Sequence, residues 1–144
     1  MFLGEYAHTL DDKGRLTLPA KFRDSFSRGV VLTRGMDGCL YAYPRERWQL
    51  LVESRLATLD PLSRDDRMIQ RHFFASAAEA MPDRQGRIMI PASLAAHAKL
   101  EREVVVAGVY DHLEIWDREA WRAQVKEIEG RAEDVAERLA AKRD

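Results

Sequence analysis

Hydrophobic and polar residues alternate over several short stretches with the period of two that half-buried β-strands have. Leu16 and Leu18 alternate with polar residues, and Ile88 and Ile90 do the same in a second stretch. Each of these runs ends at a proline, which lacks the N–H group that a strand ladder needs. Further short strands are predicted at residues 6–10, 30–33, 39–43 and 104–106, and around Leu113.

Other stretches have the spacing of three and four residues that amphipathic helices show. One predicted helix runs from Arg45 to a break at residues 60–61, and short helices are expected after each of the two strand-ending prolines. Another helix begins at Ser63, a capping residue with Asp66 three positions further on. The apolar face expected for that helix consists of Met68, Ile69, Phe73, Ala77 and Ala80.

The last predicted helix starts at Trp121, and its apolar residues form a narrow stripe with alternating spacings of four and three. The stripe consists of Trp121, Val125, Ile128, Ala132, Val135 and Leu139. This spacing resembles the seam of a coiled coil. Two interpretations stay open, because the stripe can pack on the protein's own sheets or contact another subunit.

One nine-residue stretch occurs twice, which indicates an internal duplication. Residues 11–19 read Asp-Asp-Lys-Gly-Arg-Leu-Thr-Leu-Pro, and residues 83–91 read Asp-Arg-Gln-Gly-Arg-Ile-Met-Ile-Pro. The correspondence continues well beyond this stretch, and it predicts an α+β protein built from two β-β-α-β-β-α units. Gly14 and Gly86 supply the left-handed backbone position that a tight turn requires. Each copy is therefore expected to present a β-hairpin with an arginine just after the turn.

Composition adds few constraints. The 144 residues include 23 basic and 24 acidic side chains, so the net charge indicates neither a nucleic-acid nor a membrane partner, although a local patch can still bind. The single cysteine, Cys39, excludes an internal disulfide framework and is expected to be a small buried residue in a reducing cytoplasm. Because neither a signal peptide nor a membrane-spanning apolar run is recognisable, we expect a soluble intracellular protein without membrane contact.

The sequence gives little support for an enzyme. Its four histidines, His8, His72, His97 and His112, have no ligand spacing with one another or with Cys39. No nucleophile lies in a recognisable motif, and no glycine-rich loop is suited to hold a phosphate. We therefore expect a protein that is not an enzyme and that uses no metal or cofactor.

The repeated turn is the better candidate for chemistry. Asp11 with Arg15, and Asp83 with Arg87, either brace the turns as structural pairs or present an arginine to a phosphate or a guanine. The first copy has additional basic residues, which are Lys13, Lys21, Arg23 and Arg28. The second copy has Gln85, Ser93 and Ala95 in place of the first three. We therefore expect the first copy to form the nucleic-acid face and the second to do more scaffolding.

The chain resembles the MraZ family over essentially its whole length. The resemblance lies in the doubled Asp-x-x-x-Arg, in the opening Met-Phe-Leu-Gly-Glu-Tyr and in Arg-Glu-x-Trp, which occurs at residues 45–48 and 118–121. This bacterial family belongs to the SpoVT-AbrB swapped-hairpin superfamily of transition-state regulators and antitoxins. The resemblance implies interleaved pseudo-symmetric modules, ring-shaped oligomers that are often octameric, and sequence-specific DNA binding upstream of the division and cell-wall gene cluster. Lys13 matches the basic turn residue of the family, whereas Gln85 does not.

The resemblance and the repeat together predict a domain organisation. We expect a first SpoVT-AbrB module at residues 5–47, linking helices at 48–75, a second module at 76–119 and a C-terminal helix at 120–144. Interleaving is physically reasonable, because each module alone would leave hydrophobic strands such as residues 30–32 with unpaired edges.

The expected function is that of a transcriptional regulator in the cytoplasm and nucleoid. It is expected to bind direct repeats in promoter DNA as a ring of about eight subunits. The expected DNA-binding residues are Lys13, Arg15, Lys21, Arg23 and Arg87, and the expected structural turn residues are Asp11, Gly14, Asp83 and Gly86. The alternative is an antitoxin-like module that uses the same fold to bind a partner protein.

Overall fold

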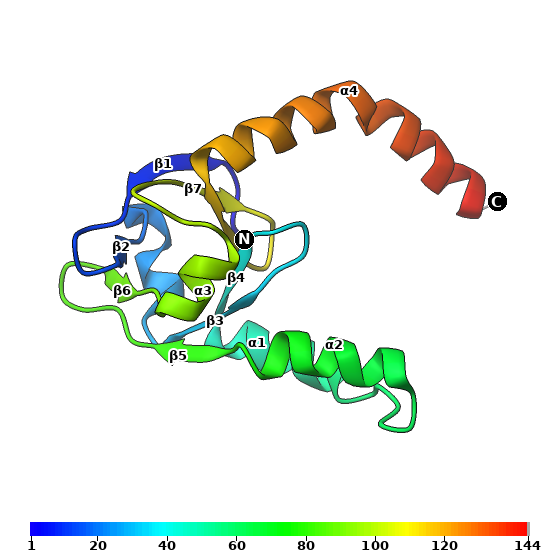
Figure 1. The fold of residues 1–144 in the computed structure, drawn as a ribbon, viewed down its shortest axis with the longest axis horizontal. Helices are drawn as coiled ribbons and strands as arrows, with labels where there is room; N and C mark the ends of the chain where they lie inside the picture. Colours follow the sequence, from blue (N-terminus) through cyan, green and yellow to red (C-terminus); the bar gives the residue numbers. More distant parts are fainter. Residues whose placement is uncertain (144) are drawn as a thin grey trace.

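Six antiparallel strands form the larger of two sheets, and two helical arms extend away from it (Figure 1). The computed structural model describes residues 1–143. The strand order across the larger sheet is β1-β7-β8-β4-β3-β5. These strands are β1 (Glu5–Thr9), β3 (Val30–Arg34), β4 (Leu40–Pro44), β5 (Ala78–Ala80), β7 (Glu103–Gly108) and β8 (Leu113–Asp117).

Each copy of the repeat contributes its first strand to the other copy. Strand β1 of the first copy pairs with β7 of the second, which places Glu5 opposite Ala107. Strand β5 of the second copy pairs with β3 of the first, which places Ala80 opposite Val30. Strands β4 and β8 join the two halves in the middle of the sheet. This arrangement confirms the predicted α+β fold of two interleaved modules.

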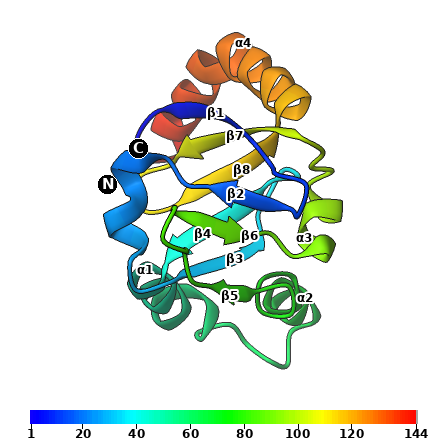
Figure 2. The same cartoon turned by 90° about the vertical axis from the view of Figure 1, so that its left-hand side faces the viewer.

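A second, two-stranded sheet lies in front of the larger one in Figure 2. It consists of β2 (Arg15–Thr17) and β6 (Arg87–Met89), one strand from each copy, and we call it the ribbon. Two backbone hydrogen bonds extend it symmetrically. Leu18 N–H donates to the Gly86 carbonyl at 2.8 Å, and Ile90 N–H donates to the Gly14 carbonyl at 3.0 Å. The end of each strand is therefore tied to the turn of the other copy.

The hydrophobic core connects the inner face of the ribbon with the larger sheet. Leu16 and Ile88 point inward from the ribbon and are fully buried. The same cluster contains Phe22 and Phe26 from a 3₁₀ helix, η1 (Ala20–Phe26), and Leu94 from α3 (Ala92–His97). The short helices predicted after the two prolines are thus present, and both of them help to close this core.

The first helical arm consists of α1 (Arg45–Leu51), a π-helical turn η2 (Val52–Leu56) and α2 (Arg64–Phe74). Ser63 caps α2 as predicted, since its hydroxyl accepts a hydrogen bond from the Asp66 N–H at 3.3 Å. The helix is fixed to β3 at its C-terminal end. There, the Thr33 hydroxyl donates to the Phe73 carbonyl at 2.7 Å, and Nε2 of His72 lies 3.0 Å from the Gly35 carbonyl oxygen.

The predicted apolar face of α2 is wrong in part. The helix ends at Phe74, so Ala77 lies beyond it and Ala80 belongs to β5. Met68 is 60% exposed, whereas Phe73 is buried as expected. The strand forms because the backbone of residues 78–80 completes the edge of β3, a tertiary pairing that the local sequence does not reveal.

The second arm is α4 (Arg118–Arg143), which begins three residues before the predicted Trp121. Its predicted stripe packs on the protein only at its start, where Trp121 donates to Glu5 at 3.2 Å and lies against Trp116. Further along, Ile128 is 47% and Leu139 52% exposed. Asp144, which the predicted helix includes, lies outside the described residues. Among the helices of residues 1–143, none combines the length and apolar character needed to cross a membrane.

Candidate nucleic-acid interface

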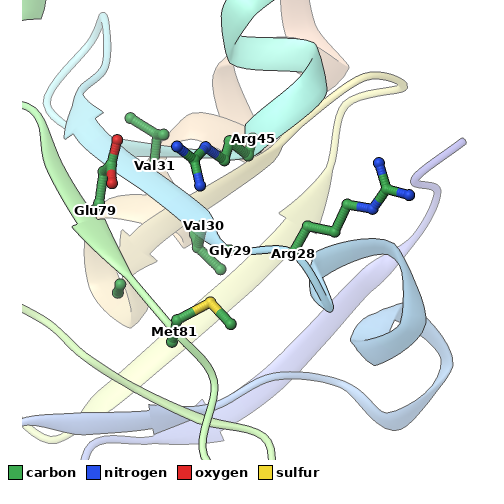
Figure 3. A pocket seen from close by; sticks show the side chains of 8 residues that line it. Arg28, Gly29, Val30, Val31, Arg45, Glu79 and Met81 are labelled. Atoms are coloured by element: carbon green, nitrogen blue, oxygen red, sulfur yellow. The ribbon is translucent and has the colours of Figure 1, made fainter.

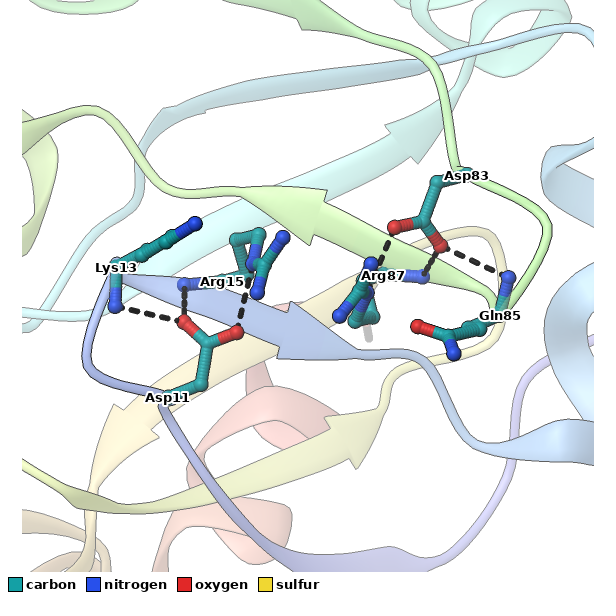
Figure 4. A network of polar contacts seen from close by, with 6 residues as sticks. All are labelled: Asp11, Lys13, Arg15, Asp83, Gln85 and Arg87. Carbon is teal, nitrogen blue, oxygen red and sulfur yellow. Dashed lines mark hydrogen bonds and ion pairs between the residues drawn. The ribbon is translucent and has the colours of Figure 1, made fainter.

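The first turn is organised by the carboxylate of Asp11 (Figure 4). Its Oδ1 accepts hydrogen bonds from the backbone N–H groups of Lys13 and Arg15 at 2.9 and 2.8 Å, and its Oδ2 accepts one from Nε of Arg15 at 2.6 Å. These donors stabilise the charged carboxylate, so the pKa of Asp11 lies below its usual range, with the backbone N–H of Arg15 as the largest cause. The turn and the arginine are thus held by one carboxylate.

The second turn repeats this geometry atom for atom. Asp83 accepts from the backbone N–H groups of Gln85 and Arg87 at 2.9 Å each, and from Nε of Arg87 at 2.7 Å. The pKa of Asp83 is also lowered, again chiefly by the backbone N–H of the arginine. Gly14 and Gly86 have φ angles of 75° and 76°, in the left-handed region where a side chain would be strained.

The two arginines lie on the outer face of the ribbon. Arg15 is opposite Met89 and Thr17 is opposite Arg87, while Leu16 and Ile88 point to the core. Side chains alternate across a strand, so Arg15, Thr17, Arg87 and Met89 share the outer face. Only Nε of each guanidinium is used for bracing, because the described residues accept no hydrogen bond from the terminal nitrogens of either arginine. The two interpretations of the Asp–Arg pairs are therefore compatible, since one arginine can brace its turn and also bind a ligand.

Arg23 belongs to the first copy but lies at the turn of the second. Its Nε donates to the Leu18 carbonyl at 3.3 Å, and a Cβ atom added to Gly86 would lie 2.5 Å from that Nε. Burial, followed by the positive charge of Arg23, lowers the pKa of the nearby His8 on β1. The second turn therefore has beside it a cation from the first copy, whereas the equivalent residue of its own copy is Ala95. The interleaving of the two copies brings Arg23 to the second turn.

The other predicted basic residues occupy different places. Lys13 is exposed at the tip of the first turn. The ammonium group of Lys21 lies 5.5 Å from the ring centre of Tyr6 and 5.4 Å from that of Phe22, so it packs over aromatic rings beside β1. Arg28 is exposed and lies 3.8 Å from Glu46, at the N-terminal end of α1.

Arg84 is a candidate that the sequence reasoning missed. It takes the position of Asp12, so the tip of the second turn has a cation where the first has an anion. Residues 11–15 contain two acidic and two basic side chains, whereas residues 83–87 contain one acidic and two basic ones. Together with Arg23, Arg84 gives the second turn basic side chains, so both turns are candidates for contact with a nucleic acid. Comparison of the equivalent positions 12 and 84 of the repeat would have revealed Arg84 from the sequence alone.

Arg102 is a second missed cation, beside the first turn. Its Nη1 lies 3.9 Å from Oδ1 of Asp12, and both side chains are exposed. The residue precedes β7, and its carbonyl accepts a hydrogen bond from the Leu10 N–H at 2.8 Å. Its proximity to the turn follows from the pairing of β1 with β7, which no local motif reveals.

A hollow of about 270 Å³ lies elsewhere, at the end of strands β3 and β5 (Figure 3). The charged residues that line it are Arg28, Arg45 and Glu79, and its lining includes no serine, cysteine or histidine. Cys39 is buried, and this burial raises the pKa of its thiol far above its usual range. Within residues 1–143, no group of three histidine, cysteine or acidic side chains is placed to hold a metal ion. The ribbon is the feature with the most specific geometry.

Comparison with known proteins gives matches along the whole length of the chain. Residues 1–72 and 73–143 each match a family described as "MraZ protein, putative antitoxin-like". "Transcriptional regulator MraZ" from Lactiplantibacillus plantarum is 48% identical over 139 residues, which cover 96% of this chain and 98% of the relative. The protein of the same name from Thermomicrobium roseum is 48% identical over 142 residues, covering 97% and 98%. The one from Limosilactobacillus fermentum is 51% identical over 121 residues, covering 84% of each chain.

Proposed function

Because the chain belongs to the MraZ family, whose relatives are named transcriptional regulators, we propose that it regulates transcription by binding DNA through the outer face of the ribbon. The observation that carries this proposal is the pair of braced arginines, Arg15 and Arg87, side by side on one two-stranded ribbon. Its targets are direct repeats in the promoter of the division and cell-wall gene cluster. The protein acts on DNA without catalysis, in the cytoplasm and at the nucleoid.

The ribbon has a suitable shape for reading bases. The major groove of B-DNA accepts a two-stranded β-ribbon, and arginine binds the O6 and N7 atoms of guanine with two parallel hydrogen bonds. The bond from Nε to Asp11 fixes the plane of the Arg15 guanidinium before DNA arrives, and Asp83 does the same for Arg87. Less side-chain entropy is then lost on binding. The carboxylates therefore act as positioning groups for the arginines.

The cations around the ribbon are suited to contact phosphates. Lys13 and Arg102 flank the first turn, while Arg84 and Arg23 flank the second. Such contacts set the position of a protein on the duplex without reading its sequence. Both modules, residues 5–47 and 76–119, contribute to this surface, so we propose that they act as one DNA-binding body. The linking helices at 48–75 and the C-terminal helix at 120–144 then serve assembly.

A single subunit should bind weakly. The formal net charge of −1 provides little general attraction to DNA. A ring of about eight subunits would present the same ribbon repeatedly, and each docked subunit would raise the effective concentration of its neighbours. The exposed stripe of α4, with Ile128 and Leu139, and exposed Met68 and Phe74 on α2 are apolar surfaces that subunit contacts would cover. They support the oligomer part of the proposal.

The decisive experiment varies the spacing of the sites. Fluorescence anisotropy compares duplexes with one repeat, with several repeats about 10 bp apart, and with several repeats offset by about half a helical turn. The affinity should rise steeply only for the in-phase set, and Arg15→Ala should abolish that rise. Arg47→Ala, in α1, removes an exposed arginine that lies away from the ribbon and outside the linking helices at 48–75, and it serves as the control.

Two outcomes would contradict the proposal. Equal binding to the three duplexes would show that assembly plays no part in recognition. A chain that binds no DNA, with or without its arginines, would instead favour the antitoxin-like alternative, in which the same fold caps a partner protein.

A further inference from the structure

The outer face of the ribbon contains one residue that neither charge nor core packing explains. Met89 lies in the last position of β6, directly opposite Arg15, and is 49% exposed. The core below is already filled by Leu16 and Ile88, and Met89 is not a member of that cluster. An apolar side chain is thus presented to solvent between two arginines, on the surface that the proposed function places against DNA.

The equivalent residue of the first copy is different. Thr17 lies opposite Arg87 just as Met89 lies opposite Arg15, but it is half-buried and its side chain is shorter. Methionine is unbranched, with three rotatable bonds and a polarisable thioether, so it reaches further and adapts to an apolar partner. The backbone and the arginines of the ribbon are pseudo-symmetric, whereas the residues beside the arginines are not.

We infer that Met89 contacts the C5-methyl group of a thymine in the major groove, next to the base that Arg15 binds. The inference rests on the proposed function and adds a base preference to it. Thymine is the base that presents a methyl group in the major groove, and apolar side chains recognise it there. Residues opposite each other on paired strands have Cβ atoms about 5 Å apart, and base pairs are about 3.4 Å apart, so two such long side chains can reach neighbouring base pairs.

This contact would give the ribbon a direction on the DNA. Two arginines with identical neighbours would read both halves of a palindrome equally well. With Met89 beside one arginine and Thr17 beside the other, the preferred site is asymmetric, and each subunit docks on it in one orientation. An asymmetric site repeated along the duplex is a direct repeat, whereas a palindromic reader would select inverted ones.

The test replaces single thymines by deoxyuridine, which lacks only the methyl group. The probe is the duplex upstream of the chain's own coding sequence, and the readout is the dissociation constant. Wild-type protein should lose about fourfold in affinity at one thymine of each repeat, the effect expected for one buried methyl group. Met89→Ala should bind the thymine and deoxyuridine duplexes equally, whereas Met89→Leu should keep the discrimination. Thr17→Ala, the pseudo-symmetric control, should leave the sensitivity at that thymine unchanged.

Each result separates this inference from the function it rests on. If wild-type protein binds in an Arg15-dependent way but no deoxyuridine weakens binding, the thymine contact is absent while the DNA-binding function stands. If Met89→Ala keeps the full sensitivity, another residue reads the methyl group and the assignment to Met89 is overturned. If wild-type protein does not bind the duplex at all, the proposed function fails together with the inference.

Discussion

Gly14→Ala and Gly86→Ala form a matched pair of substitutions that tests the placement of Arg23. Both glycines have left-handed backbones, with φ angles of 75° and 76°. They differ in what a new methyl group would meet. At Gly14 the nearest atom is the carbonyl oxygen of Ile90 at 3.8 Å, an ordinary contact. At Gly86 it is Nε of Arg23 at 2.5 Å, so the arginine must move.

The two variants should lose similar stability but differ in DNA binding. A left-handed alanine costs about 1–2 kcal/mol, which lowers the melting temperature by about 3–8 °C for a chain of this size. The Arg23 side chain swings away in Gly86→Ala, and the second turn loses a cation. If that cation contacts a phosphate, the slope of log affinity against log salt should decrease by about one for each bound subunit. Gly14→Ala should leave this slope unchanged.

The assay combines thermal melts at one protein concentration with DNA titrations at several salt concentrations. The same two substitutions are then made in an Arg23→Ala background, which turns the comparison into a double-mutant cycle. There, Gly86→Ala should have no further effect on the salt slope. A slope that changes equally in both glycine variants would refute the reasoning, as would an effect of Gly86→Ala that persists without Arg23.

Three further predictions address the arginines, a buried histidine and the C-terminal helix. Arg15→Lys keeps the charge but loses the planar guanidinium. Like Arg15→Ala, it should therefore lose about 1–3 kcal/mol of DNA-binding free energy per base contact. Full DNA binding by the lysine variant would show that Arg15 contributes only its charge. Burial lowers the pKa of His112, but the carboxylates of Glu114 and Asp111, 3.7 and 2.7 Å from its ring nitrogens, raise it by more. Its charge therefore stabilises the fold below about pH 6.5, and this stabilisation is lost as the pH rises through the higher folded pKa. The difference in melting temperature between wild type and His112→Gln should shrink accordingly from about pH 6 to about pH 8, and a constant difference would exclude the ion pairs. Ile128→Glu should reduce the mass of the assembly in light scattering, and an unchanged mass would show that the α4 stripe is not a subunit contact.

The local sequence was sufficient to predict the turns and the helix cap, which depend on neighbouring residues alone. The turns at Gly14 and Gly86 require left-handed glycines, and Ser63 caps its helix through the expected hydrogen bond. The strand at residues 78–80 was missed because alanine favours helices, and only its pairing with β3 makes this segment extended. The duplication predicted two similar units. The exchange of strands between them was predicted only from the family resemblance, because a repeat alone does not specify it.

The candidate site was predictable within each copy but not between the copies. The Asp-x-x-x-Arg spacing was enough to suggest that Asp11 braces Arg15, because both residues lie in one turn. The contact between Arg23 and the second turn joins residues of different copies, so it depends on the tertiary exchange of strands. Lys21 was grouped with the turn by charge alone, whereas the structure places its ammonium group over aromatic rings.

The pairing of β1 with β7 has a consequence for how the protein is made. Glu5 emerges from the ribosome 102 residues earlier than its partner Ala107. At about 5–20 residues per second, β1 therefore waits about 5–20 seconds for the strand that covers its edge. Until residues 78–80 are made, β3 also lacks β5, so the nascent first half exposes one edge of the hydrophobic strand Val30–Arg34 to other chains. The interleaving that stabilises the finished protein thus leaves its first half dependent, during synthesis, on the prompt arrival of the second.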